Sequence, residues 1–189
     1  MRRSLGGWVA GASLFGAVAI ALFVRGDGDA YSDTVALARG LGYLAFVLLS
    51  AALCVSPLRR WLPESSTLRR ALGLAAASAA LFHAEVGLWS SPLGVGEQLA
   101  DPQLRFGFAG LALLGALAVT SFPAVVTWMR LRSWKELHRL AYIAWLCALL
   151  HGLLSPYAWM RGLCAIAAVT LTLGLLRLVP RPTRTPPAS

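Results

Sequence analysis

Six apolar runs separated by short polar connections divide the sequence. Each run is close to the roughly 20 residues of helix that cross a hydrocarbon core of ~30 Å. Backbone groups in lipid must pair inside a helix or around a closed barrel, and no run alternates with period two. The pattern predicts an all-α fold, an integral membrane bundle of six transmembrane helices at about Gly7–Val24, Val35–Val55, Ala71–Trp89, Phe106–Val126, Leu137–Leu154 and Gly162–Leu178.

The connections between these runs contain the helix breakers and are short. They read RGDGDAYSD, SPLRRWLPESSTLRR, SPLGVGEQLADPQ and SPYAWMRG, and none has room for a soluble domain. The segment PRPTRTPPAS that begins at Pro180 is rich in proline and is expected to be disordered. We therefore expect one transmembrane domain over residues 1–179 and a disordered cytoplasmic tail over residues 180–189. The first run resembles a secretory signal, but five further apolar runs follow it, so we expect a retained helix.

The composition agrees with a membrane protein and changes how the charge is interpreted. Hydrophobic residues make up 58% of the chain and charged residues 13%, which leaves too little polar surface to cover a soluble globule. The net charge of +9 lies in clusters between the apolar runs, so it indicates membrane topology and not a nucleic-acid site. Cys54, Cys147 and Cys164 stand singly without CxxC spacing, which argues against a disulfide framework or a cysteine metal site.

Basic residues gather at one end of the predicted helices. That end receives 13 of the 17 Lys and Arg residues, and five acidic residues lie on the opposite side. The 13 are Arg2, Arg3, Arg59, Arg60, Arg69, Arg70, Arg130, Arg132, Lys135, Arg139, Arg177, Arg181 and Arg184. The positive-inside rule then predicts that both termini are cytoplasmic.

The three histidines are the candidate functional residues, because ionisable groups are rare in transmembrane segments. His83 lies 13 residues beyond Arg70, and His151 lies 12 beyond Arg139. Their predicted helices run in the same direction, so both histidines lie roughly 18 to 20 Å from the cytoplasmic end at about 1.5 Å per residue. Two imidazoles at matching depth can hold one haem iron axially, an arrangement that suits electron transfer.

His138 lies near the cytoplasmic face, 13 residues before His151. On a regular helix the two side chains point about 140° apart, so both can face one seam only if the helix bends or bulges. Arg69 is 14 residues before His83 and at a similar depth to His138. Both residues are candidates for a second haem or a quinone site, in which Arg69 would more easily pair with a propionate than ligate iron. An interfacial role for His138 is an equally open alternative.

Several segments resemble the ferric reductase-like transmembrane superfamily, and within it the haem-binding membrane subunit of bacterial periplasmic methionine-sulfoxide reductase systems. They are Arg69-Arg70 followed by LGL and His83, then LRFGFAGLALLGALAVTS, then WKELHRLAY with His151 beyond. The resemblance covers about Gly40 to Leu154. It departs in the first outer connection, where DAYSDTVALARG replaces a proline-containing segment ending in His-x-Thr-Gly.

This resemblance implies an inner-membrane cytochrome b that carries one haem b or two. It implies axial ligation at His83 and His151, a second haem or quinone site at His138, and a bound FMN. It also implies electron flow from a cytoplasmic flavin reductase or the quinone pool to a periplasmic molybdenum-containing reductase of oxidised methionine. Such a subunit has no substrate site and no catalytic residue of its own, since the cofactor carries the redox step.

Two other classes of protein remain as alternatives. A transporter or metal-permease subunit would use the histidines to line a cation path, but such proteins usually contain inverted repeats with broken helices, and no repeat is visible here. A purely structural membrane subunit would leave the three histidines unexplained.

Overall fold

The computed structural model describes residues 30–55, 57, 65–129, 131–156 and 159–175. The elements in these ranges are helices, and none of the residues in them forms a strand, which confirms the all-α prediction. The first predicted run, Gly7–Val24, and the tail over residues 180–189 lie outside the described residues. The helices are α2 (Ala30–Cys54), α3 (Ser65–Ser90), α4 (Val95–Ala100), α5 (Pro102–Val119), α6 (Pro123–Trp128), α7 (Leu131–Leu137), α8 (Leu140–Leu154) and α9 (Met160–Leu175).

Four stretches of the described chain are long and apolar enough to cross a membrane. They are Asp33–Cys54, Ser66–Ser90, Pro102–Val119 and Arg132–Leu154, the last of which joins α7 and α8. These correspond to the second, third, fourth and fifth predicted spans. The sixth prediction corresponds to α9, a shorter apolar helix over Met160–Leu175.

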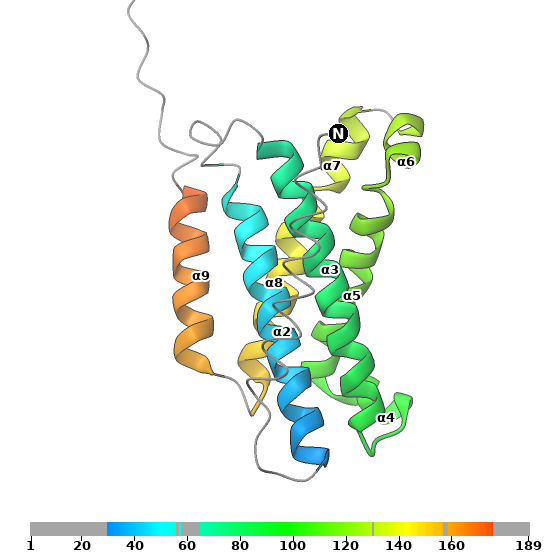
Figure 1. Ribbon diagram of the computed structural model, residues 1–189, viewed down its shortest axis with the longest axis vertical. Coiled ribbons are helices and arrows are strands. Elements are labelled where there is room, and N and C mark those ends of the chain that lie inside the picture. Colours follow the sequence, from blue (N-terminus) through cyan, green and yellow to red (C-terminus); the bar gives the residue numbers. More distant parts are fainter. Residues whose placement is uncertain (1–29, 56, 58–64, 130, 157–158, 176–189) are drawn as a thin grey trace, which may run out of the picture.

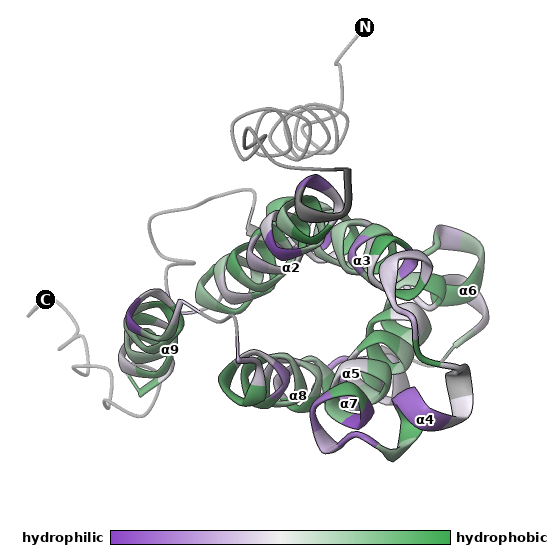
Figure 2. Cartoon of the chain, turned by 90° about the horizontal axis from the view of Figure 1, so that it is seen from below, coloured by the Kyte–Doolittle hydropathy of each residue, from purple (hydrophilic) through white to green (hydrophobic). Residues whose placement is uncertain are grey.

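The long helices form two antiparallel pairs, α2 with α3 and α5 with α8 (Figure 1). Viewed from one end, these four helices surround a common centre, while α9 stands outside them and contacts α2 and α8 (Figure 2). The short helix α4 lies at one end of the bundle, called here the α4 end, and α6 and α7 lie at the other, called the α7 end. Because α3 and α8 both run from the α7 end to the α4 end, they are parallel, as the sequence predicted.

The fourth apolar run does not form a single helix over Phe106–Val126. The helix α5 ends at Val119, and α6 begins again at Pro123. Proline disfavours the helical conformation of the residue before it, and Phe122 is accordingly extended, with φ −65° and ψ 138°. The hydroxyls of Thr120 and Ser121 donate to carbonyls of the preceding turn, which satisfies acceptors at the helix end.

The fifth predicted run, Leu137–Leu154, corresponds to α8 from Leu140 onward, and a turn at His138 and Arg139 separates α8 from α7. Around this point the N–H groups of Arg139, Ala141 and Tyr142 donate to carbonyls three residues earlier, as in a 3₁₀-helix. A 3₁₀ turn winds by about 20° more per residue than an α-helix. Extra winding of this kind reduces the angle of about 140° that a regular helix gives between His138 and His151.

The core lies where α2 and α8 cross. The rings of Phe46 and Trp145 stack with centroids 5.7 Å apart, and the Trp145 indole N–H donates to the buried Ser50 hydroxyl at 2.8 Å. A hydrogen bond between helices fixes their rotation, because neither partner can turn toward lipid without losing it. Buried residues of five helices complete the cluster: Leu49, Leu53, Ala76, Leu114, Ala144, Leu163 and Ala167.

Many large apolar side chains of the bundle are exposed, as on a lipid-facing surface, and the helices consist mostly of hydrophobic residues (Figure 2). Leu81, Ile143 and Leu171 are each more than half exposed. Tryptophans are the most exposed aromatic residues, with Trp89 at 85% and Trp128 at 86%. They lie near opposite ends of the bundle, where tryptophan is enriched at membrane interfaces.

We expect Ser50→Ala to destabilise the folded bundle by about 1 kcal/mol, because the Trp145 N–H loses its partner in an apolar core. Thermal unfolding of the detergent-solubilised protein measures this. Ser78→Ala is the matched control, since the exposed Ser78 hydroxyl bonds only to Leu74 of its own helix. Equal melting temperatures for the two variants would contradict a structural role of the Ser50–Trp145 bond.

Candidate functional site

A cavity of about 380 Å³ lies between α2, α3, α5 and α8, in the half of the bundle toward the α4 end. Its volume is in the range of small-molecule and cofactor sites, which typically measure about 300–1,000 Å³. Its walls are mostly apolar, and polar side chains gather toward the α4 end, namely Ser90, Ser91, Gln98, Gln103 and Ser155. Such a lining can enclose a largely apolar molecule that has a polar edge.

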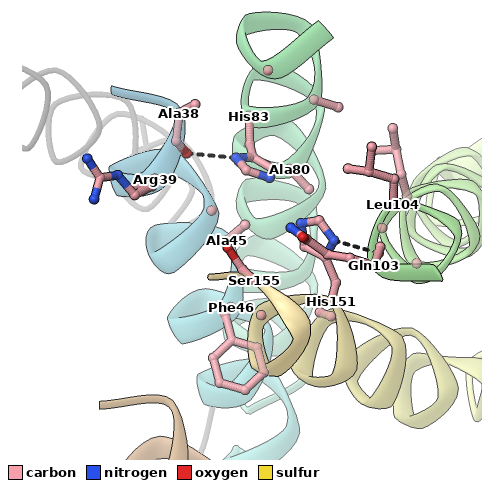
Figure 3. A pocket seen from close by; sticks show the side chains of 18 of the residues that line it. Ala38, Arg39, Ala45, Phe46, Ala80, His83, Gln103, Leu104, His151 and Ser155 are labelled. Carbon is pink, nitrogen blue, oxygen red and sulfur yellow. Dashed lines mark hydrogen bonds between the residues drawn. The ribbon is translucent and has the colours of Figure 1, made fainter. Parts of the chain in front are cut away.

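His83 of α3 and His151 of α8 project into this cavity from different sides (Figure 3). Their ring centroids lie 5.8 Å apart and their planes are inclined by 71°. The structure therefore places these two histidines at one level of the bundle, where the sequence spacing predicted them.

Each imidazole is tied through its Nδ1 atom to a backbone carbonyl of a neighbouring helix. His83 Nδ1 lies 2.7 Å from the carbonyl oxygen of Ala38 on α2, and His151 Nδ1 lies 2.9 Å from that of Gln103 on α5. A carbonyl can only accept, so Nδ1 must carry the proton and donate. The lone pair is then on Nε2, which is the arrangement of a metal-ligating histidine whose other nitrogen is held by an outer-shell partner.

The Gln103 carbonyl is set in place by the start of α5. The Asp101 side chain accepts the Gln103 backbone N–H at 2.7 Å, and Pro102 occupies the first helical turn. Asp at the N-cap and Pro at the first position are favoured helix starts. Arg105 fixes α4 against this turn by donating to the carbonyls of Leu99 and Ala100. The local sequence thus determines where the acceptor for His151 lies.

The two imidazoles suit a haem better than a bare metal ion. Metal–nitrogen bonds of about 2 Å on opposite sides of one ion place imidazole centroids roughly 6.4 Å apart, close to the spacing of His83 and His151. A bare transition-metal ion usually needs three or more protein ligands. Among the residues that the structure describes, no group of three or more His, Cys, Asp or Glu side chains could supply them. A haem brings four equatorial nitrogens, so two histidines suffice.

His138 and Arg69 lie together at the α7 end, where they line a second cavity of about 60 Å³ with Arg70 and Ser121. His138 Nδ1 lies 3.0 Å from the Trp134 carbonyl oxygen, and its Nε2 lies 3.3 Å from Ser121 Oγ. The cavity is smaller than typical cofactor sites. A second haem or a quinone ring there would require the surrounding helices or side chains to separate.

The two cavities meet at Leu49 of α2 and Leu114 of α5, since both residues line each of them. Both side chains are almost fully buried. An apolar partition therefore separates the His83–His151 site from the His138–Arg69 site within the same bundle.

Sequence reasoning did not identify the carbonyls of Ala38 and Gln103. They are backbone groups, and no side-chain pattern marks which helical carbonyl will accept a second bond. The only available signal was the glycine four residues after each, discussed below.

Fold and site together define a multi-pass membrane protein with paired histidines inside a helical bundle. Residues 41–149 match the family described as "Ferric reductase like transmembrane component", and the chain belongs to this family. The matched range includes His83 and His138 and ends two residues before His151. The resemblance found in the sequence is thereby confirmed.

Bacterial relatives show which members of this family the chain is similar to. The chain is 34% identical over 143 residues to the protein-methionine-sulfoxide reductase heme-binding subunit MsrQ of Deinococcus radiodurans, covering 72% of this chain and 71% of that protein. It is 33% identical over 153 residues to MsrQ of Herminiimonas arsenicoxydans, covering 76% and 66%. MsrQ of Cronobacter sakazakii is 32% identical over 146 residues, covering 73% and 70%. With four membrane-capable helices among the described residues, the chain is a multi-pass protein of the bacterial inner membrane.

Proposed function

We propose that this chain is a haem b-binding electron-transfer subunit of the inner membrane, with His83 and His151 as the axial ligands of one haem. The observation that carries the proposal is the pair of imidazoles 5.8 Å apart, each held through Nδ1 so that Nε2 is available to a metal. The names of the MsrQ relatives describe heme-binding subunits and support the same cofactor.

A bound haem supplies reversible one-electron transfer. His83 and His151 hold it from two sides, and their backbone partners fix the ring orientations. The apolar walls exclude water, while Arg39 and the polar groups toward the α4 end suit the propionates. Because both axial positions are taken by histidine, no coordination site remains for a substrate. The chain therefore relays electrons and leaves substrate chemistry to a partner.

The metal-permease alternative is less well supported. A cation path needs ligands that can replace the hydration shell of a bare ion. The described part of the chain offers His83 and His151 with no third His, Cys, Asp or Glu beside them. The two imidazoles are also fixed by hydrogen bonds to carbonyls, which suits a permanently bound group more than a passing ion.

We further propose that both termini are cytoplasmic and that electrons move from the α7 end to the α4 end. Arg69, Arg70, Lys135 and Arg139 lie toward the α7 end, which the positive-inside rule places in the cytoplasm. His138 and Arg69 stand there as an entry point, at a second haem or a quinone site. The His83–His151 site lies nearer the opposite, periplasmic end, from which an electron can leave.

The proposed direction of electron transfer indicates on which side of the membrane each partner binds. We propose that the acceptor is a periplasmic molybdenum-containing methionine-sulfoxide reductase, since the relatives are named as subunits of protein-methionine-sulfoxide reductases. The donor is a cytoplasmic flavin reductase or the quinone pool, and FMN is a candidate second cofactor on that side. The two donors are distinguished by measuring whether a quinol or a flavin reductase reduces the haem of the purified protein.

Replacing either proposed ligand by alanine should remove most of the haem, because one axial bond and its orientation are lost. The reduced-minus-oxidised spectrum of the purified full-length protein measures b-type haem per protein. His138→Ala is the matched control and should keep the haem of the His83–His151 site. Full haem retention in both His83→Ala and His151→Ala would refute the proposed ligation.

Filling the cavity should also prevent haem binding without touching a ligand. Ala80 lines the cavity one turn before His83, so we expect Ala80→Phe to lower the haem content at least several-fold. Ala112→Phe adds the same ring on the exposed surface of α5 and should leave the haem content unchanged. Equal haem content in both variants would place the haem elsewhere.

Removing the positive charge of Arg69 should slow electron entry, because this side chain lines the cavity next to His138. We expect Arg69→Gln to reduce the rate of haem reduction by the physiological donor in membrane vesicles, with the haem spectrum retained. Arg132→Gln removes the same charge from a side chain that is 91% exposed and paired with Glu136, and serves as the control. Similar rates for the two variants would argue against an entry site at Arg69.

A further inference from the structure

The two imidazoles are held by the same kind of hydrogen bond, although they belong to different helix pairs. In the first pair, His83 of α3 donates to the Ala38 carbonyl of α2, at 2.7 Å. In the second pair, His151 of α8 donates to the Gln103 carbonyl of α5, at 2.9 Å. In each case the acceptor is on the helix that packs against the histidine's own helix.

Each acceptor carbonyl is followed four residues later by a glycine, Gly42 after Ala38 and Gly107 after Gln103. Side chains on a helix lean toward its N-terminus, so the residue at position i+4 covers the turn that contains the carbonyl of residue i. With glycine at that position, the carbonyl can accept a second bond from outside the helix. The imidazole occupies the space that a side chain would take.

The distances show how closely the rings fill this space. A Cβ atom added to Gly42 would lie 3.1 Å from both Nδ1 and Cε1 of His83. One added to Gly107 would lie 2.9 Å from Nδ1 of His151 and 3.1 Å from its Cε1. Contacts this short force the ring to move, and the atom that must move is the one that makes the hydrogen bond.

Three other glycines in the described part of the bundle lack any such contact. A Cβ added to Gly73, Gly115 or Gly174 would meet nothing within 4 Å. Alanine is the better helix former, so at those positions it should be tolerated. Gly115 belongs to the same helix as Gly107, which makes it a matched control.

We propose that Gly42 and Gly107 are positioning residues for the haem ligands: each keeps one helical carbonyl open, so that the imidazole Nδ1–H binds there and Nε2 is presented to the iron. This inference rests on the haem ligation proposed above. It assigns to the two glycines, which line the same cavity, a function that reaches the iron through the histidines.

The consequence concerns the strength of the axial ligands. A hydrogen bond from Nδ1–H to a carbonyl makes the imidazole a stronger electron donor and fixes its orientation. A stronger donor favours ferric iron and so lowers the reduction potential. Gly42→Ala and Gly107→Ala should therefore raise the reduction potential of the haem and weaken haem retention roughly 10- to 100-fold, the usual effect of losing an outer-shell partner.

The experiment compares full-length Gly42→Ala, Gly107→Ala and Gly115→Ala proteins in detergent. Spectroelectrochemical titration gives the haem potential, and haem loss to excess apomyoglobin gives retention. We expect a raised reduction potential and weaker haem retention in Gly42→Ala and Gly107→Ala. Gly115→Ala should show neither change. Gly107→Ala should show the larger change, because its Cβ would approach Nδ1 more closely.

Three results would overturn the inference in different ways. If His83→Ala and His151→Ala lose haem but Gly42→Ala and Gly107→Ala match the unmodified protein, the ligation stands and the role of the glycines fails. If the histidine variants keep their haem, the ligation fails and the glycine proposal falls with it. Effects of Gly115→Ala equal to those of the other two variants would assign them to the helix backbone and also reject the proposal.

A double-variant cycle covers the case in which Gly42→Ala does not accumulate in the membrane. Once the imidazole is removed by His83→Ala, the added methyl group has nothing to displace. Gly42→Ala should then change the accumulation and melting temperature of the His83→Ala protein no more than Gly115→Ala does. If Gly42→Ala lowers accumulation or melting temperature in the His83→Ala protein as much as in the unmodified protein, the methyl group clashes with something other than His83. That result would overturn the proposal.

Discussion

Hydrocarbon offers no hydrogen bonds, so backbone groups inside this bundle must find their partners within the chain, and a polar side chain there is costly without one. This constraint makes each long apolar stretch helical, because a helix pairs its own backbone. It also explains why the exposed Ser78 hydroxyl bonds back to its own helix. The polar groups that instead bridge helices are few, and they determine how the helices are rotated against one another.

Three bridges of this kind organise the centre. The Trp145–Ser50 bond ties α8 to α2, the His83–Ala38 bond ties α3 to α2, and the His151–Gln103 bond ties α8 to α5. Together they connect the four helices that surround the cavity. The same bonds that satisfy the imidazoles leave their Nε2 atoms available, so the stability of the bundle and the proposed haem ligation depend on one set of contacts.

The bundle is also polarised along its length. The cavity with His83 and His151 lies toward the α4 end, and the small cavity with His138 and Arg69 lies toward the α7 end, where basic residues are concentrated. Leu49 and Leu114, both almost fully buried, line both cavities. An electron can tunnel between two sites that are separated by apolar side chains, which agrees with the proposed electron-transfer subunit.

The sequence alone determined the helical class, the approximate second to fifth spans and the equal depth of His83 and His151, because length and spacing along a helix convert directly into distance across a membrane. It missed the break at Phe122–Pro123, since apolar composition continues on both sides of it, and it raised a bend near His138 only as a condition for His138 and His151 to face one seam. The tertiary structure alone decided which carbonyls receive the imidazoles and that Gly42 and Gly107 lie against these rings. Those facts depend on how one helix is rotated against its neighbour, and helix rotation is set by packing between residues far apart in the chain.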